Sequence, residues 1–371
     1  MAPGIPKSMK AVVLTGHGGL DRLEVHDGWP VPTPGDGDVL VRVRATALNN
    51  TDINTRTAWY HEDVKSGITT EGGQSGFTDA EGKSSGWSGA AISFPRIQGA
   101  DICGEIVAVG PGVAQDRVGE RVIVDGWLRD PDDPFNAEKA GYLGSESDGG
   151  FAQYTKIASN LAHRIESPLS DEELASFPCA YATCENMVSR ARVAAGDQVL
   201  VTGASGGVGS AAIQLCKRRG ATVIALAGEG KHDQLRPLGA DMLLPREPDD
   251  LAAALAPITG DGKVDVVLDV VGGPMFATVT DRLRHFGRYA SCGAIGGPTV
   301  EFNLRNLIYR DLEFFGATIL PPQVFADLIG YIERGEVKPV IGRTFRLDQI
   351  HAAQELFLTK QLVGKIVLTV D

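Results

Sequence analysis

The sequence predicts an α/β protein in which a β-barrel-like first part is followed by a doubly wound parallel sheet. Three observations support this prediction. The chain has 371 residues, which is more than one hydrophobic core usually supports. Short β-like runs separated by turn residues fill about the first 165 residues, whereas helices and strands alternate from about Ser170 onward. We therefore expect two domains.

The first part contains short strands and two long irregular stretches. We expect strands over residues 10–15, 23–25, 39–44, 102–109 and 121–124, with a Pro/Gly turn over 30–37. Residues 66–93 and 129–149 are polar and show no periodicity, so both are predicted to be surface loops. A barrel with two excursions fits this pattern.

The second part alternates helices with apolar strands, which is typical of a parallel sheet. The predicted strands are 198–202, 222–226, 242–244, 264–269, 287–291 and 312–318. The predicted helices are 171–176, capped by Ser170, then 184–194, 207–219, 232–238, 251–258 and 274–283. After Pro321 we expect helices over 324–334 and 347–358, a β-like segment over 337–345 and a last strand over 364–369 that returns to the first domain.

Composition excludes several classes of protein. Lys and Arg number 35 against 47 Asp and Glu, a net charge of −12, so binding to nucleic acid or to an anionic membrane is not expected. The five cysteines (103, 179, 184, 216 and 292) are odd in number and lack C-x-x-C spacing, which argues against a disulfide framework. Residues 1–11 lack the pattern of a signal peptide and no apolar run reaches membrane-spanning length, so we expect a cytoplasmic protein.

The most informative segment is the glycine-rich turn within residues 199–210, VLVTGASGGVGS. It follows an apolar strand and opens an apolar-periodic helix, which is the setting that a dinucleotide-binding turn requires. Here Gly206 and Gly207 let backbone approach a pyrophosphate, Gly209 allows close packing of helix on strand, and the first N–H groups of the helix bind the anion. Ala204, Ser205 and Val208 complete the predicted turn. A structural turn without a ligand is the alternative reading.

The end of the next strand bears on the choice between NADP and NAD. An NAD site usually has an acid there that binds the ribose hydroxyls, but this strand ends Leu226-Ala227-Gly228. Lys231 follows and can face a 2′-phosphate, which favours NADP, although it can equally be a solvated lysine at a helix start. Glu229 favours NAD, because it can accept a hydrogen bond from a 2′-hydroxyl and repels a phosphate.

Four segments in order resemble the medium-chain dehydrogenase/reductase superfamily over essentially the whole chain. They are MKAVVLT at 9–15, QGADICGEIVAVG at 98–110, the glycine-rich turn and GKIVL at 364–368. The resemblance implies a GroES-like β-barrel catalytic domain with an inserted Rossmann domain and an active site between them. On this basis the catalytic domain spans 1–165 and returns at 321–371, and the NAD(P)-binding domain spans 166–320. A homodimer is also implied, with residues 298–303 as a candidate edge strand.

The positions that hold catalytic zinc in the zinc alcohol dehydrogenases of this superfamily are altered. Asn49 stands where the first Cys is expected, and the Gly-His-Glu triplet reads Gly99-Ala100-Asp101. Cys179 alone matches a third ligand, and residues 129–149 contain no cysteine for a structural zinc. One thiolate does not make a three-ligand site, so no zinc is expected and Cys179 is interpreted as a buried small residue. The sequence then resembles the zinc-independent quinone oxidoreductase and enoyl reductase-like branch.

By this resemblance the catalytic candidates lie near Thr51, whose position carries the proton-relaying hydroxyl in zinc relatives. Asn49 and Asn50 can donate to a carbonyl or to the nicotinamide amide, and Tyr60 is a candidate acid beside Trp59. Each also has a structural reading, as a turn former or loop anchor. Arg56 is expected to be a surface arginine, with contact to an acidic substrate group as the alternative. The resemblance assigns the nicotinamide and ribose contacts to Thr183, Val208, Val270, Val271, Gly293 and Ala294. It brings Lys365 toward the pyrophosphate, with a solvent-facing lysine as the alternative.

The expected function is a zinc-independent, NAD(P)H-dependent reductase, with NADP(H) favoured over NAD(H). Hydride would pass to a quinone or an α,β-unsaturated carbonyl, so the expected partners are small molecules. Two alternatives stay open. One is a metal-free carbonyl reductase or alcohol dehydrogenase, and the other is a non-catalytic protein that has kept the dinucleotide site.

Overall fold

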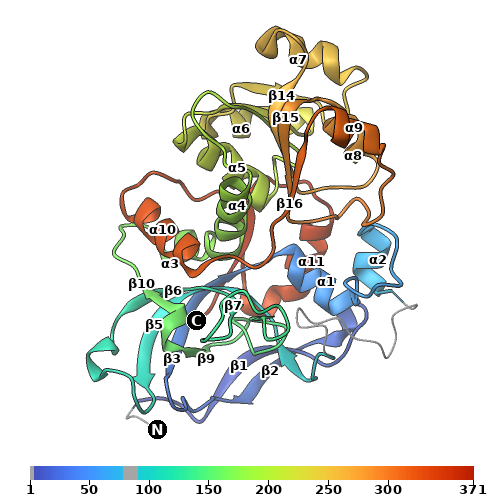
Figure 1. Cartoon of the computed structure of the whole chain (residues 1–371). Coiled ribbons are helices and arrows are strands. Elements are labelled where there is room, and N and C mark those ends of the chain that lie inside the picture. Colours follow the sequence, from blue (N-terminus) through green and yellow to red (C-terminus); the bar gives the residue numbers. More distant parts are fainter. Residues whose placement is uncertain (1–3, 78–90) are drawn as a thin grey trace.

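The computed structural model describes residues 4–77 and 91–371, which form two sheet-containing parts (Figure 1). The first part, drawn in blue and teal at the bottom, consists mainly of antiparallel strands. Its strands are β1 (Ser8–Leu14), β2 (Leu23–Pro30), β3 (Asp38–Ala47), β4 (Arg96–Ile97), β5 (Asp101–Val109), β6 (Arg121–Val124), β7 (Trp127–Leu128), β8 (Gly141–Tyr142), β9 (Tyr154–Ala158) and β10 (Ala162–Arg164). Two helices accompany them, α1 (Asn50–Thr57) and α2 (Thr70–Ser75).

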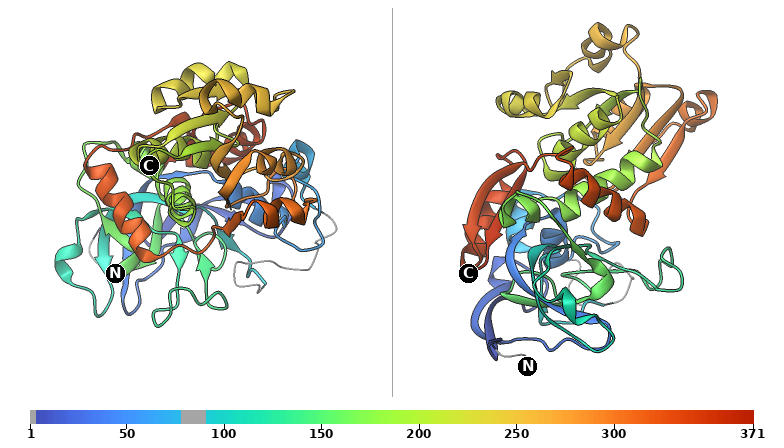
Figure 2. Two further views of the ribbon diagram at one scale, coloured as in Figure 1. Left: turned by 45° about the horizontal axis from the view of Figure 1, so that its top comes forward. Right: turned by 90° about the vertical axis from the view of Figure 1, so that its left-hand side faces the viewer.

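The C-terminal strands belong to this first part, because they extend its main sheet. The sheet has the order β10-β6-β5-β3-β18-β17, with β9 also paired to β3. Here β17 is Ile341–Arg346 and β18 is Lys365–Thr369, and β18 runs antiparallel to β3 with Val367 opposite Ala47. Apolar side chains of β3, β5 and β18, among them Leu40, Ile102 and Leu368, are fully buried in one core. In the right-hand view of Figure 2 the C-terminal strands, in red, lie beside the blue strands of the first part.

The second part is a parallel sheet with the order β13-β12-β11-β14-β15-β16. Its strands are β11 (Gln198–Val201), β12 (Thr222–Leu226), β13 (Met242–Leu244), β14 (Val264–Asp269), β15 (Leu283–Ser291) and β16 (Glu313–Gly316). The helices from this point on are α3 (Asp171–Ala175), α4 (Pro178–Arg190), α5 (Gly207–Arg218), α6 (His232–Leu235), α7 (Leu251–Thr259), α8 (Met275–Asp281), α9 (Leu304–Tyr309), α10 (Pro322–Glu333) and α11 (Ile350–Leu358).

Both faces of this sheet are buried, as the apolar runs of its strands require. Within β11, Val199 and Val201 face a core that includes α4 and α5, whereas Leu200 faces a second core with α7 and α8. The alternation follows from the two-residue period of a strand, and burial on both faces explains why Val199, Leu200 and Val201 are all apolar.

Most predicted elements are present, and the differences have local causes. Helix α3 begins where predicted, because Ser170 Oγ accepts from the Glu173 N–H at 3.2 Å and the Glu173 carboxylate accepts from the Ser170 N–H at 2.8 Å. Helix α4 starts at Pro178, six residues before the predicted helix, because proline suits a first helical turn.

Two further predictions about local structure differ from what is observed. Within the predicted 66–93 loop, Thr69 caps the short helix α2, and residues 78–90 lie outside the described part of the chain. Residues 298–303, expected to form an edge strand, are not in a strand, and β16 forms that edge of the sheet instead. In the described ranges, no helix is long and apolar enough to cross a bilayer.

Candidate active site

The glycine-rich turn connects β11 to α5 and has the close packing predicted for it. Gly203 has φ +56, a conformation that favours glycine. A Cβ on Gly209 would lie 2.3 Å from the Gly203 carbonyl oxygen, so only glycine lets α5 begin so near the strand. The first N–H groups of the 12-residue helix therefore face the space in front of the turn, which is where a helix binds an anion.

Two adjoining cavities, of about 980 and 1110 Å³, open beside this turn. We call the first the substrate cavity and the second the dinucleotide cavity. They share a boundary formed by both domains, with Asn50 and Phe357 from the catalytic side and Gly207, Val208 and Val270 from the parallel-sheet side. A ligand that spans the two cavities thus crosses from the phosphate-binding turn to the barrel.

The dinucleotide cavity carries three cations, Lys231, Arg246 and Lys360. Lys231 Nζ donates to Ser205 Oγ at 3.2 Å and to the Lys360 carbonyl at 2.6 Å, and Lys360 Nζ donates to Asn50 Oδ1 at 3.0 Å. None of the three forms an ion pair with a carboxylate among the residues that the structure describes. Burial and the charge of Lys231 lower the pKa of Lys360 to about 8, as expected for cations gathered without a counter-ion. The cavity therefore fits a phosphorylated ligand.

Most residues predicted to bind the cofactor line one of these cavities. The dinucleotide cavity is lined by Ser205, Gly206, Gly207, Val208, Gly209, Lys231, Val270 and Val271, and the substrate cavity by Thr183, Val208, Val270, Gly293 and Ala294. Two predicted residues line neither. Ala204 is fully buried beneath the turn, and Gly228 lies in the turn that follows β12. The prediction missed Arg246 and Lys360, which come from other parts of the sequence.

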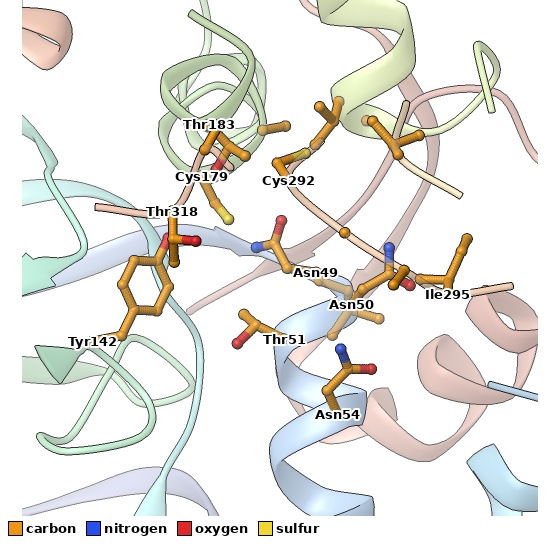
Figure 3. A pocket seen from close by; sticks show the side chains of 18 of the residues that line it. Asn49, Asn50, Thr51, Asn54, Tyr142, Cys179, Thr183, Cys292, Ile295 and Thr318 are labelled. Atoms are coloured by element: carbon orange, nitrogen blue, oxygen red, sulfur yellow. The ribbon is translucent and has the colours of Figure 1, made fainter. Parts of the chain in front are cut away.

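The start of α1 brings the catalytic candidates into the substrate cavity. Asn49, Asn50 and Thr51 line it (Figure 3). Trp59 and Tyr60 line it as well. The Asp52 carboxylate accepts from the Asn49 N–H at 2.7 Å, which fixes this first helical turn. Tyr60 hydrogen-bonds with Thr51 and Asn54, and burial raises its pKa to about 12. Tyr60 is therefore a protonated hydroxyl at neutral pH, able to donate a hydrogen bond.

Asn49 is held by a buried network beneath the cavity. Its amide donates to Asp101 Oδ2 at 2.8 Å, and its Oδ1 accepts from the Lys365 ammonium. Lys365 Nζ also lies 2.8 Å from Asp101 Oδ2 and donates to the Leu48 carbonyl at 2.7 Å. The Lys365 side chain is buried, which contradicts the solvent-facing alternative, and its ammonium points into this network.

Asp52 and Cys179 complete the network. Cys179 lies at the start of α4, and its N–H donates to Asp101 Oδ1 at 2.6 Å. Burial raises the pKa of the Cys179 thiol to about 12, so the thiol is protonated at neutral pH. Burial also raises the pKa of Asp52 to about 7, although the Asn49 N–H and the Lys365 charge act in the opposite direction.

These residues do not fit a zinc site. Both Asp101 oxygens already accept hydrogen bonds, and one of them also pairs with the Lys365 ammonium. Asn49 offers only an amide, which is a poor zinc ligand, and the side chain of Ala100 has no atom that can bind a metal. Within residues 4–77 and 91–371, no three His, Cys, Asp or Glu side chains lie close enough together to hold a metal ion. The donor set is that of a hydrogen-bonded ion pair.

The sequence-based prediction missed one wall of the substrate cavity. Trp127, Tyr142, Cys292 and Thr318 come from three distant segments and line this cavity. Figure 3 shows Tyr142 and Thr318 on the left-hand side of Asn49. Burial raises the pKa of Tyr142 well above its usual value. No local motif marks these residues, because only the fold brings them together.

Arg56, which the sequence suggested as a surface arginine, is fully buried. Its guanidinium donates to the Gly18 carbonyl at 2.8 Å, to the Gln354 side chain at 3.0 Å and to the Gly73 carbonyl at 2.5 Å. It therefore joins α1 to α2, α11 and the N-terminal turn. An acidic substrate group has no access to it.

A short strap, residues 59–68, joins α1 to the parallel-sheet domain across this cavity. Trp59 Nε1 donates to the Ser66 carbonyl at 2.9 Å, and the Ile68 N–H donates to the Ile295 carbonyl at 2.9 Å. Both Trp59 and Ile295 line the substrate cavity. The strap thus gives this cavity an apolar, aromatic wall.

Two family models match the chain. Residues 35–167 match the alcohol dehydrogenase GroES-like domain, and residues 207–334 match the zinc-binding dehydrogenase model. The crystal structure of a candidate alcohol dehydrogenase from Sinorhizobium meliloti 1021 is similar to this chain at 43% identity with a TM-score of 0.89, covering 100% of this chain and 98% of that one.

Two curated relatives share the full length. An acryloyl-coenzyme A reductase of Metallosphaera sedula is 27% identical over 97% of this chain and 100% of its own. A quinone oxidoreductase of Rattus norvegicus is 26% identical over 99% of each chain. With both domain models in order and a 43% identical structure over its whole length, the chain belongs to the medium-chain dehydrogenase/reductase superfamily, in its quinone oxidoreductase and enoyl reductase-like branch.

Proposed function

We propose that this protein is a zinc-independent, NADPH-dependent reductase that transfers hydride to a quinone or to the β-carbon of an α,β-unsaturated carbonyl. One observation carries the proposal: a dinucleotide cavity with three cations adjoins a substrate cavity that has hydroxyl donors and aromatic walls and, among the residues that the structure describes, no metal-ligand set. The relatives that reduce quinones and an enoyl thioester support the same reaction class.

The cofactor would lie with its pyrophosphate at the start of α5 and its nicotinamide near Thr183, Val208 and Ala294. Lys231, Arg246 and Lys360 support a 2′-phosphate, and therefore NADPH over NADH. When bound, the reduced nicotinamide supplies a hydride from its C4 carbon. The turn glycines and the cations of this chain hold and orient it.

The chain's hydroxyl groups then act on the substrate oxygen. As hydride adds to the β-carbon, the carbon–carbon double bond shifts its electrons to the carbonyl oxygen, which becomes negatively charged. Tyr60 and Thr51 lie on the cavity wall, and the raised pKa of Tyr60 keeps it a hydrogen-bond donor during this step. Water supplies the proton that completes the reduction.

Steady-state assays test the function directly. NADPH and NADH oxidation are followed with a quinone, an enone and an aldehyde, each with and without a chelator. We expect turnover of the quinone or enone that is faster with NADPH and unchanged by chelation. Loss of activity on chelation with recovery on adding zinc would contradict zinc independence. Turnover of the aldehyde alone would identify the metal-free carbonyl reductase alternative. Tight cofactor binding without any turnover would identify the non-catalytic alternative.

We also propose a homodimer formed through the β16 edge and α9 of the parallel-sheet domain. Phe286, Leu304, Ile308 and Tyr309 are 62–70% exposed there, which is unusual for apolar side chains gathered on one domain. The proposed occupant is a second copy. Light scattering should give twice the chain mass, and Ile308→Arg should give the monomer mass; a monomeric wild type would contradict the proposal.

All five cysteines are free, which supports a reducing, cytoplasmic location.

A further inference from the structure

The substrate cavity has one charged group on its wall. Of the described residues that line this cavity, Lys365 is the only lysine, arginine, aspartate or glutamate. The two carboxylates of the network, Asp52 and Asp101, are buried and do not line it. A ligand in the cavity therefore faces the ammonium and is separated from the carboxylates.

The ammonium is fixed in place. Its three acceptors are the Leu48 carbonyl at 2.7 Å, Asp101 Oδ2 at 2.8 Å and Asn49 Oδ1, which matches the three N–H groups of a protonated lysine. Asp101 is held in turn by the Cys179 N–H at 2.6 Å and by the Asn49 amide at 2.8 Å. The aliphatic stem of Lys365 packs under the phosphate-binding turn, since a Cβ on Gly207 would lie 2.8 Å from Lys365 Cδ. The charge cannot swing away when a ligand enters.

By the resemblance described above, Asn49 and Cys179 stand at positions that hold the metal in the zinc relatives, and Asp101 directly follows the histidine position, Ala100. A cation is thus present at this point of the fold, but it is an ammonium supplied by the last strand, β18. A fixed positive charge in a buried site stabilises negative charge that develops nearby, and it needs no reorganisation during the reaction.

We propose that Lys365 is a positioning residue that supplies this fixed positive charge, and that its field stabilises the negative charge on the substrate oxygen during hydride transfer. This inference rests on the proposed function. Lys365 does not donate to the substrate, because its three N–H groups are already used. It acts through space and through the orientation of Asn49.

Four variants test the proposal in the full-length protein. Lys365→Met removes the charge at similar length, and Asp101→Asn removes its partner. The double variant removes both charges of the Lys365–Asp101 pair, so Asp101 is not left as a buried carboxylate without its cation. Lys156→Met is the matched control, because Lys156 lies on β9 with a half-exposed side chain paired to Asp38. Thermal stability, NADPH affinity, KM and kcat are measured for each.

We expect Lys365→Met to lower kcat by about 100-fold or more, the typical cost of losing a preorganised charge stabiliser, with KM and NADPH affinity changed only a few-fold. The double variant should recover thermal stability and keep the low kcat. Recovery of both stability and kcat in the double variant would show a purely structural ion pair and overturn the proposal. A loss confined to NADPH affinity would also overturn it, by placing Lys365 in cofactor binding.

A measurement without turnover separates this proposal from the proposed function. The pKa of bound 4-nitrophenol is read from its visible absorbance in the NADP⁺ complex of each variant. A fixed positive charge should lower that pKa in wild type and Lys156→Met, and the lowering should be lost in Lys365→Met and in the double variant. Equal values in all variants would overturn the proposal even if the wild type reduces enones. A lowered pKa in a wild type that reduces no quinone or enone would overturn only the proposed function.

Discussion

Lys231→Met should convert the dinucleotide cavity from one that favours NADPH to one that distinguishes the two cofactors poorly. Lys231 Nζ is 3.2 Å from Ser205 Oγ on the phosphate-binding turn, and Arg246 and Lys360 line the same cavity. At an effective dielectric of about 20, two unit charges about 6 Å apart interact by about 3 kcal/mol. Lys231 is half-buried, so solvent screening reduces the expected loss to about 1–2 kcal/mol.

That loss corresponds to a 5- to 30-fold weaker Kd for NADPH, at about 1.4 kcal/mol per tenfold. The Kd of each cofactor is measured by quenching of tryptophan fluorescence at fixed ionic strength. NADH, which lacks the 2′-phosphate, should change by less than about twofold. The control is Lys156→Met, which removes the same charge far from the cavity. Equal weakening of NADPH and NADH would refute the reasoning, because it would place Lys231 at the shared pyrophosphate.

Three further predictions follow from the same geometry. Gly209→Ala should destabilise the protein by about 1–3 kcal/mol and impair binding of both cofactors, since the new Cβ would lie 2.3 Å from the Gly203 carbonyl oxygen. Thermal unfolding measures the loss, with Gly28→Ala as the control, because a Cβ on Gly28 has no atom within 4 Å. An unchanged melting temperature in Gly209→Ala would contradict the close packing. Because the pKa of Lys360 is about 8, binding of NADPH above that pH should take up a proton; calorimetry in buffers of different ionisation enthalpy measures the uptake, which should vanish in Lys360→Met. Burial raises the pKa of Asp52 from 3.8 to about 7, so the stability that this carboxyl contributes is complete below pH 3.8 and is lost as pH rises through 7, with the free energy of unfolding falling by about 1.4 kcal/mol per pH unit. Urea unfolding across this pH range should show a shallower dependence of that free energy on pH for Asp52→Asn. The same pH dependence in both proteins would contradict a buried carboxyl group.

The sequence by itself determined the dinucleotide turn and most of the strands and helices around it. The turn is readable because its chemistry is local: consecutive glycines between an apolar strand and an apolar helix satisfy steric and anion-binding needs within a dozen residues. Residues Gly206, Gly207 and Gly209 accordingly line the dinucleotide cavity. The altered metal positions were readable for the same reason, since each lies in a short motif.

The error at Arg56 shows where this kind of inference ends. A charged side chain in a polar helix reads as exposed, but three acceptors from Gly18, Gly73 and Gln354 make its burial possible. Two of those acceptors are backbone carbonyls, which are invisible to any pattern of side chains. The early start of α4 goes with the proline at its first position, and the helix at residues 70–75 begins at the Thr69 cap; the apolar periodicity of the sequence shows neither.

Only the tertiary structure decided what stands at the base of the substrate cavity. Lys365 lies more than 300 positions from Asn49 and more than 260 from Asp101, yet β18 pairs with β3, and β3 with β5, so the three side chains meet. The cations Arg246 and Lys360 and the wall formed by Tyr142 and Thr318 arise in the same way. The glycine-rich turn is a local motif, because its phosphate-binding site is formed by the backbone of a few consecutive residues. The charge that faces the substrate depends on side chains joined by strand pairing, and strand pairing is a property of the whole fold.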